Sequence, residues 1–491
     1  MVPEIRIQTC NSQPINPRGE FILYWMIAQR RVDWNFGLQR SVEWAEKLSK
    51  PLVILEALRC DYRWSSERIH KFVWDGMSDN ARRLQNAPAF YYPYVEPAVG
   101  AGKGLLAALS QHACVIVTDD FPCFFLPKMS ASAALQVSVL MEKVDSNGLL
   151  PLSAADGAFK TAYSFRRFLQ KTLPEHLLQF PKTDPLRDLK SLKLASLPAK
   201  ILERWPAAGE SILSGESPAL RALPIDHSVP VVETCGGASA AEVRCNEFLQ
   251  RRLSRYHEDR NQPEQDATSG LSPYLHFGHI SVHQILAKIM EIEDWNPARL
   301  SITANGHREG WWGMSAAAES FLDELVTWRE VGYNFCSQRG DYDQYDSLPD
   351  WVKTTLAKHA SDPRAHIYCR EEFETAKTHD RLWNAAQTQL LRDGRIHNYL
   401  RMLWGKKILE WSCSPREALE IMIELNNKYA LDGRNPNSYS GIFWVLGRYD
   451  RPWGPERPIF GTVRYMSSEN TARKVKVKNY MTRYKYEPPS L

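Results

Sequence analysis

The chain has 491 residues, enough for two or more domains that each bury a core of their own. Its 61 Lys and Arg residues nearly balance 57 Asp and Glu residues, so overall charge does not by itself indicate a nucleic-acid partner. The 9 cysteines are scattered without a CxxC pair, and no stretch approaches about 18 consecutive apolar residues. These features exclude a disulfide framework and a membrane span, and they predict a soluble, cytoplasmic protein that is not exported.

The first 150 residues alternate between short apolar runs and amphipathic stretches. The apolar runs predict strands at residues 21–26, 51–58, 89–95 and 114–119. The amphipathic stretches predict helices at residues 33–48, 65–85 and 105–112. Strands that alternate with helices indicate an α/β domain over residues 1–150, with a Rossmann-like parallel sheet covered on both faces.

A glycine-rich segment in this domain, Gly100 to Gly104, invites comparison with a phosphate-binding loop. The spacing of that motif fails, because Pro97 stands where the first glycine belongs. We therefore interpret the segment as a turn.

Prolines recur from residue 151 to 238 among short apolar pieces, which predicts a long linker. Residues 239–491 then form a predicted all-α domain. Ser414 and Glu417 have the spacing of a capping box, with Pro415 at the first helical position, so a helix should begin there. Gly433, just past that helix, is expected to take a left-handed conformation.

Residues 397–444 are the most informative part of the chain. At about 100° per residue, Arg401, Trp404 and Trp411 fall within a stripe roughly 80° wide on one helix. A buried Arg needs a carboxylate partner, and Asp432 is the nearest candidate. A cation with two indoles suits a planar polar ligand better than a plain apolar core.

The C-terminal end is locally basic, with ten Lys and Arg residues against four Asp and Glu residues from Arg448 onward. Such a surface permits phosphate contacts. A solvated helix face explains the charge run equally well.

Three motifs stand in the helical half in a specific order. They are TSGLSPYLHFG (residues 268–278), FLDELVTWRE (residues 321–330), and LRMLWGKKILEW followed by DGRNPN (residues 400–411 and 432–437). Together they resemble the DNA photolyase/cryptochrome superfamily, and most closely the class II cyclobutane pyrimidine dimer photolyases. The resemblance is dense from about Arg255 to Met466 and loose over the N-terminal half.

The resemblance implies that the helical domain binds FAD. Hydroxyls and backbone N–H groups that open a helix suit a diphosphate. Arg401 and Asp432 match the ion pair beside the flavin ring, and Asn426 matches an asparagine that faces the ring. The full set of implied FAD-binding residues is Tyr256, Thr268, Ser269, Gly270, Leu271, Ser272, Arg329, Asn398, Arg401, Asp432 and Asn437.

It also implies light-dependent repair of pyrimidine dimers in DNA, with catalytic roles for Glu324, Asn426, Trp328 and Trp444. Glu324 matches the acid that binds a lesion base, and Trp328 and Trp444 match aromatic walls for a flipped dimer. Trp404, Trp383 and Trp411 match the tryptophan relay that reduces the flavin from the surface. A single Trp at helical spacing usually belongs to a core, but the motif order favours the relay.

Several expectations are less specific. Arg451 and Arg464 match a DNA-facing segment, although either could be a surface ion-pair partner. His276 and His279 lack an acidic or Cys partner, so no metal site is expected. Residues 296–314 depart from the family pattern and are expected to form an extra loop near the DNA-binding face. An antenna chromophore of deazaflavin or folate type is compatible with the family, but no residues can be assigned to it.

A cryptochrome-type photosensor, which keeps FAD but does not repair DNA, is the alternative function. The lesion-side residues argue against it, as does the chain end about 25 residues after the resemblance stops. A DNA-binding flavoprotein without repair activity is a second alternative. The expected partner is DNA that contains pyrimidine dimers, and the protein is expected to be a monomer without membrane contact.

Overall fold

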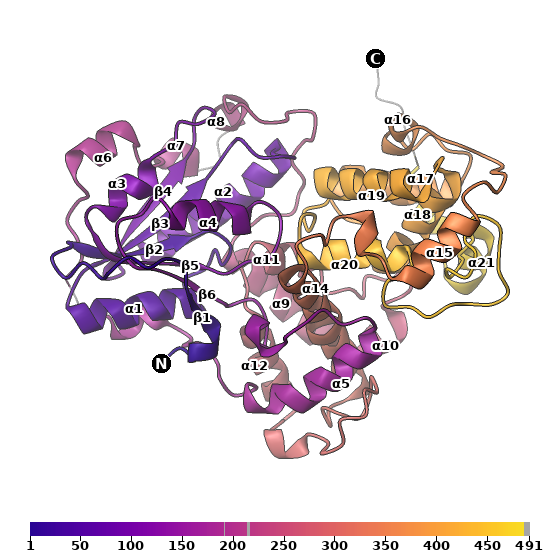
Figure 1. Cartoon of the computed structure of the whole chain (residues 1–491), viewed down its shortest axis with the longest axis horizontal. Helices are drawn as coiled ribbons and strands as arrows, with labels where there is room; N and C mark the ends of the chain where they lie inside the picture. The colour runs from indigo at the N-terminus through magenta and orange to yellow at the C-terminus, as the bar shows by residue number, and fades with distance from the viewer. Residues whose placement is uncertain (191, 214–216, 486–491) are drawn as a thin grey trace. The chain divides into compact units, whose positions relative to one another are not determined.

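The computed structural model describes residues 1–190, 192–213 and 217–485. The chain divides into two compact units. The first comprises Met1–Ala155, Thr172–Asn246 and Gly270–Trp295, and the second comprises Asp156–Lys171, Glu247–Ser269 and Asn296–Leu491. Figure 1 shows the strands among the indigo and purple N-terminal elements, and helices throughout the orange and yellow C-terminal part.

Unit 1 is built on a six-stranded sheet with the order β1-β6-β5-β2-β3-β4. All neighbouring strands are parallel except β1, which pairs antiparallel with β6. The strands are β1 (Ile7–Thr9), β2 (Phe21–Met26), β3 (Leu52–Leu58), β4 (Ala89–Val95), β5 (Ala113–Asp119) and β6 (Met141–Val144). The four predicted strands are present, and β1 and β6 were not predicted.

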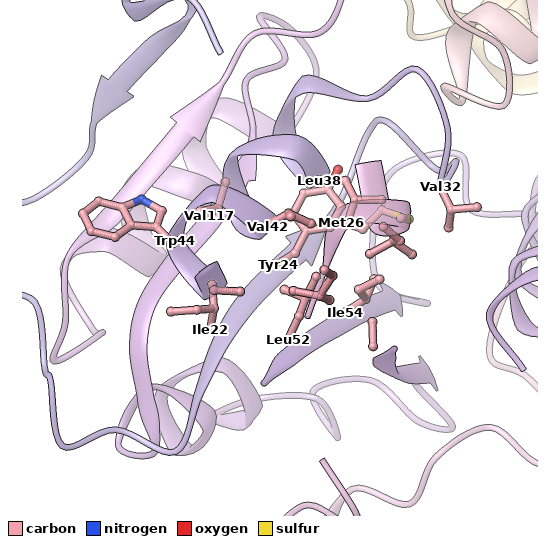
Figure 2. Packing of buried hydrophobic residues seen from close by; sticks show 14 of the residues in the cluster. Ile22, Tyr24, Met26, Val32, Leu38, Val42, Trp44, Leu52, Ile54 and Val117 are labelled. Carbon is pink, nitrogen blue, oxygen red and sulfur yellow. The ribbon is translucent and has the colours of Figure 1, made fainter. Parts of the chain in front are cut away.

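One apolar core of unit 1 lies on the face of the sheet that α1 (Phe36–Leu48) covers. Alternate residues of β2 and β3 point toward it, because successive side chains of a strand face opposite ways. Figure 2 shows Ile22, Tyr24 and Met26 of β2 beside Leu38 and Val42 of this helix. The helix α2 (Glu67–Leu84) reaches the same face, since its Asn80 Nδ2 donates to Glu56 Oε2 of β3 at 2.9 Å.

A buried carboxylate at the end of β5 holds the turn that follows β2. Asp119 Oδ2 accepts backbone N–H bonds from Ile27, Ala28 and Gln29 at 2.9, 2.8 and 2.9 Å. Its Oδ1 accepts the Tyr24 hydroxyl at 2.7 Å. Three charge-assisted bonds satisfy donors that the turn would otherwise bury unpaired.

The remaining α-helices of unit 1 surround the sheet or extend from it. They are α3 (Leu105–Ser110), α4 (Leu126–Ala134), α6 (Ala199–Arg204), α7 (Glu210–Leu213), α8 (Ser217–Arg221), α11 (Ser272–His276) and α12 (Val282–Ile292), with α9 (Ala238–Arg251) running on into unit 2. The glycine-rich segment before α3 is a turn, with left-handed φ values of 79° at Gly100 and 91° at Gly104.

The proline-rich segment that we expected to connect the domains carries short helices, and its residues 172–238 group with unit 1. It contributes Leu186 and Leu189 to the sheet core. It also contributes Ala208, Leu220 and Leu223 to a smaller cluster on α2. Its apolar pieces therefore pack against the α/β unit.

Unit 2 is helical. Its α-helices are α5 (Ala162–Thr172), α10 (Leu253–Asp259), α13 (Ala316–Leu322), α14 (Arg329–Gln338), α15 (Asp350–Lys358), α16 (Arg370–Glu374), α17 (Arg381–Asp393), α18 (Asn398–Trp411), α19 (Pro415–Tyr429), α20 (Pro436–Val445), α21 (Ser468–Lys474) and α22 (Lys478–Arg483). Helix α14 packs on α20, and α18 packs between α17 and α19. An α/β unit followed by a helical one confirms the predicted fold class.

The helix start at α19 is as predicted, because the Ser414 side chain accepts from the backbone N–H of Glu417 at 3.1 Å. The prediction for Gly433 was wrong. The left-handed residue is Arg434, with a φ of 61°. The backbone N–H of Arg434 donates to Asn427 Oδ1 at 2.7 Å, so a tertiary hydrogen bond rather than glycine's freedom holds this turn.

All 9 cysteines lie in the described residues and are free. Among the described helices, none combines the length and the apolar character that a membrane crossing requires.

Candidate functional site

The helix that carries Glu324 and Trp328 is interrupted by a π-helical turn, η6 (Asp323–Trp328), between α13 and α14. Such turns are rare, and they recur at functional sites because they change where the following side chains point. Asp323 fixes this one through two bonds from Arg166, Nε to Oδ1 at 2.9 Å and Nη2 to Oδ2 at 3.1 Å. Glu324 and Trp328 are half-buried on the turn.

Glu324 forms a close ion pair with Arg260, which follows α10. Burial raises the pKa of the Glu324 carboxyl, and the neighbouring Arg260 opposes that rise. The Arg260 guanidinium also lies 5.7 Å from the ring of Tyr256, which is buried against Phe248 and Phe321. A carboxylate held in place by an arginine can accept a hydrogen bond, which suits recognition of a base. We did not predict Arg260, since 64 residues separate it from its partner.

Trp328, the last residue of η6, contacts Trp444 of α20. Their ring centroids are 4.4 Å apart and the rings are nearly parallel, at 19°. The two indoles are therefore stacked on each other and form one half-buried aromatic surface, whereas we expected two walls with a lesion between them. Asp450 orients this surface, because its Oδ1 accepts from Trp444 Nε1 at 3.1 Å.

A fully buried lysine contacts the residue that follows Trp444. Lys406 of α18 is 0% exposed, and its ammonium donates to the backbone carbonyl of Val445. Burial lowers the pKa of Lys406 to about 7, with Arg464 adding to the effect and Asp450 opposing it. Burial also raises the pKa of Asp450, so the two groups share a site that disfavours charge.

Lys406 should make stability depend on pH. Below pH 7 the side chain is charged in both the folded and the unfolded chain. Between pH 7 and the unfolded pKa of about 10.4, the folded chain releases its proton first, so stability should rise with pH. We expect the stability of the native protein relative to K406M to rise by about 2–4 kcal/mol over that interval. Urea unfolding at pH 6.5 and 9.5 measures this, with exposed Lys103→Met as control. A constant difference between native protein and K406M would contradict it.

Arg401 and Asp432 form an ion pair, with Arg401 Nη2 at 3.1 Å from Asp432 Oδ1. Their side chains are 25% and 17% exposed, so the pair is less buried than the helical stripe suggested. Ser438 fixes the loop from the other side by donating to the Asp432 carbonyl at 2.7 Å. The pair leaves Arg401 Nε buried and without a hydrogen-bond partner in the described part of the chain.

His397, at the start of the same helix, has both ring nitrogens buried and unpaired within the described residues. Burial lowers its pKa to about 4, so the ring is neutral near pH 7. Buried polar atoms normally have partners. Unsatisfied donors on Arg401 and His397 therefore fit a ligand with polar ring atoms, as the isoalloxazine of FAD has, and the residues present are compatible with that cofactor.

Asn426 is buried and belongs to a hydrogen-bonded network of side-chain amides. Its Nδ2 donates to Asn427 Oδ1 at 3.2 Å, and Asn427 Nδ2 donates to the hydroxyl of Tyr439 at 3.2 Å. Because Asn427 also accepts from the backbone of Arg434, the network ties α19 to the loop that carries Asp432. It holds the Asn426 amide in one orientation.

The three tryptophans of the expected relay lie together in one buried cluster. Trp383, Trp404 and Trp411 are 0%, 2% and 3% exposed. Trp383 Nε1 donates to the Trp404 carbonyl at 2.9 Å, and the rings of Trp383 and Trp411 are 6.0 Å apart. Trp411 itself is covered by Tyr368 and His379, at 5.8 and 4.9 Å between ring centroids. We expected the relay to reach the surface, but Tyr368 and His379 lie over Trp411.

The remaining expected FAD residues are more scattered. Thr268 and Ser269 end a segment of unit 2, while Gly270, Leu271 and Ser272 begin a segment of unit 1. Gly270 has a φ of 68°, and a Cβ there would meet Arg244 Nε at 2.6 Å, so glycine is favoured at this turn. Buried Arg329 donates to the Tyr333 hydroxyl at 3.0 Å. Asn398 and Asn437 are exposed.

Arg451 and Arg464 are exposed and lie near the same indole. Their guanidinium carbons are 5.9 and 5.4 Å from the ring of Trp453, which is 44% exposed. Two cations beside an exposed aromatic ring form a surface suited to nucleic acid.

Residues 296–314 form an irregular loop of unit 2 that begins with a single 3₁₀ turn, η5 (Pro297–Arg299). Gly306 anchors the loop, because its N–H donates to Gln170 Oε1 at 2.7 Å. Trp311 and Trp312 are buried and in edge-to-face contact.

Among the described residues of the chain, no group of three or more His, Cys, Asp and Glu side chains could hold a metal ion.

No protein-family model matches the chain. A deoxyribodipyrimidine photo-lyase of Methanothermobacter thermautotrophicus is 33% identical over 483 residues, which cover 98% of each chain. One of Arabidopsis thaliana is 30% identical over 480 residues, which cover 96% of this chain and 90% of that protein.

Solved structures show the same fold. A bacterial class III photolyase from Agrobacterium tumefaciens has a TM-score of 0.64 at 17% identity, over 95% of this chain and 86% of that one. A cryptochrome from Synechocystis has a TM-score of 0.65 at 14% identity, over 94% of this chain and 88% of that one. With relatives at 30% identity or more over nearly its whole length, the chain belongs to the DNA photolyase/cryptochrome superfamily.

Proposed function

We propose that this protein repairs cyclobutane pyrimidine dimers in DNA with light and bound FAD. Near-full-length relatives that carry the name deoxyribodipyrimidine photo-lyase make the chain a DNA photolyase. The choice of dimer and the electron-transfer route are the finer parts of the proposal. The observation that carries them is the stacked pair Trp328 and Trp444, on the same unit as the ion pair of Glu324 and Arg260.

These residues would bind the lesion after it leaves the duplex. Unstacking a base costs a few kcal/mol, least where a lesion already distorts the duplex, and stacking on an indole returns about 1–3 kcal/mol per base. Because Trp328 and Trp444 are already stacked on each other, the dimer would lie against their joint surface. Glu324, held by Arg260, would hydrogen-bond a base through its carboxyl.

The flavin would be held by unit 2, with Arg401 and Asp432 beside the ring and Asn426 facing it. When bound, FAD supplies the electron that light transfers to the dimer. The protein's part is to orient the two and to keep their surroundings fixed, which the network of Asn426 and Asn427 supports. The cluster of Trp383, Trp404 and Trp411 would conduct electrons toward the flavin.

The decisive experiment follows dimers in a synthetic duplex. The FAD-loaded, chemically reduced protein is mixed with an oligonucleotide that contains one thymine dimer, and half of each sample is illuminated. We expect light-dependent loss of the dimer and recovery of two thymines, as chromatography would show. Dimers that survive illumination, with DNA binding intact, would contradict repair.

A cryptochrome-type photosensor is the second candidate, and the fold shared with the Synechocystis cryptochrome favours keeping it. The same experiment separates the two, because a photosensor would change the redox state of its flavin under light and leave the dimer intact. A duplex with a (6-4) photoproduct, run in parallel, tests which lesion the protein accepts.

A further inference from the structure

The C-terminal segment from Arg473 to Lys485 carries one kind of charge only. It has six basic residues and no acidic one, and all six side chains are exposed. None of the six forms an ion pair with any residue that the structure describes. We call this set the basic ridge; its members are Arg473, Lys474, Lys476, Lys478, Arg483 and Lys485.

The outward direction of these charges is fixed by buried residues between them. Val475 and Val477 are 7% and 5% exposed, whereas the lysines at 474, 476 and 478 are exposed, so the lysines point to solvent. Farther along, the Tyr480 hydroxyl donates to Gln389 Oε1 at 2.8 Å, and the Tyr484 hydroxyl to Asp393 Oδ2 at 2.6 Å. The segment that carries the ridge is thus held on α17 by these two tyrosines.

The ridge is also attached to the loop that carries the lesion-side arginine. The backbone N–H of Lys476 donates to Gln262 Oε1 at 3.2 Å, and that of Asn479 to Glu264 Oε1 at 2.6 Å. This loop begins at Arg260, the partner of Glu324. Glu264 accepts from the backbone and the side chain of Asn479, and its single negative charge leaves the six cations of the ridge in excess. The ridge is therefore held against the segment that follows Arg260.

We infer that the basic ridge binds the phosphates of duplex DNA beside the lesion. Six unpaired cations in one segment repel each other, and an anionic backbone with regularly spaced charges relieves that repulsion. Contacts of this kind supply affinity and register but no choice of sequence or lesion. The inference rests on the proposed function for the identity of the partner, and it assigns to unit 2 a DNA-binding element separate from the aromatic surface.

The test is the salt dependence of DNA binding by the FAD-loaded protein. The variant K474Q/K476Q/K478Q removes three charges from the ridge. The matched control, K103Q/K128Q/K200Q, removes three exposed lysines of unit 1 that form no ion pair within the described part of the chain. Fluorescence anisotropy measures Kd for two labelled duplexes, one with a thymine dimer and one without, between about 50 and 200 mM salt.

We expect the ridge variant to lose about tenfold or more in affinity at low salt, and its log–log salt slope to fall by about 2–3, as three lost phosphate contacts require. Both duplexes should weaken by the same factor, so the preference for the dimer stays within about twofold. The control should keep the native slope.

Equal slopes for the ridge variant and the control would overturn the inference. So would lost binding to vesicles of anionic lipid with unchanged binding to DNA, since the partner would then be a membrane. The illumination experiment is independent of this one: a protein that binds through the ridge but leaves dimers intact contradicts repair and not the ridge.

Discussion

Replacing Trp404 with Phe is expected to stop light-driven reduction of bound oxidised FAD almost completely. Phenylalanine fills most of the same buried space, but its ring is much harder to oxidise than indole. A barrier raised by about 2 kcal/mol already slows a step about thirtyfold. The Trp404 carbonyl accepts the Trp383 indole N–H at 2.9 Å, so Trp404 lies against another member of the cluster. Absorbance of the flavin under continuous blue light, with an external reductant, gives the rate.

Two controls make the result specific to the relay. Trp74→Phe changes an equally buried indole, 1% exposed, on α2 of unit 1, and should leave the rate unchanged. W404F also loses the bond from Trp404 Nε1 to Gln387 Oε1, so circular dichroism must show that the fold persists. Chemically reduced W404F should repair dimers at the native rate. Native photoreduction in W404F would refute the relay.

Removing the carboxylate of Asp432 is expected to weaken FAD binding by about 2 kcal/mol, or about thirtyfold, as loss of a hydrogen bond to a charged group predicts. D432A leaves the Arg401 guanidinium without its partner, and its Nε is already unsatisfied. The cation would then lie beside the flavin ring without its carboxylate partner. Titration of the apoprotein with FAD, followed by flavin fluorescence, gives the Kd.

Glu374→Ala is the matched control. It breaks the ion pair between Glu374 and Lys428 in the same unit, in which each side chain is 23% exposed. We expect it to leave the Kd for FAD unchanged. The double variant R401A/D432A separates pairing from a general loss of charge, because it removes the uncompensated cation. Its Kd should lie closer to native than that of D432A. Native affinity in D432A would contradict the assignment of this pair to the flavin.

Patterns of apolar residues were sufficient to predict the central elements of the fold. Strands β2 and β4 have the predicted bounds, and β3 and β5 differ by one residue at their start. Their continuous apolar runs reflect burial on both faces of a parallel sheet. Strand β1, at one edge of the sheet, and its neighbour β6 escaped prediction, because they are three and four residues long and carry polar side chains.

Among the contacts of the proposed functional residues, one was predicted from the sequence and others were not. Arg401 and Asp432 were paired from the sequence, because an arginine on an aromatic helix face requires a nearby carboxylate. Arg260 with Glu324, and Asp450 with Trp444, were not foreseen. Any of many arginines or carboxylates could have supplied these partners, and only the packing of the helices selects one.

The sequence by itself predicted the central elements of the fold and indicated the side chains that we propose for the chemistry, because burial and helical periodicity act over a few residues. Only the tertiary structure decided how those side chains meet. It placed Glu324 and Trp328 on a π-helical turn, stacked Trp328 on Trp444, and buried Lys406. These arrangements depend on contacts between helices distant in the chain, and such contacts leave no local pattern in the sequence.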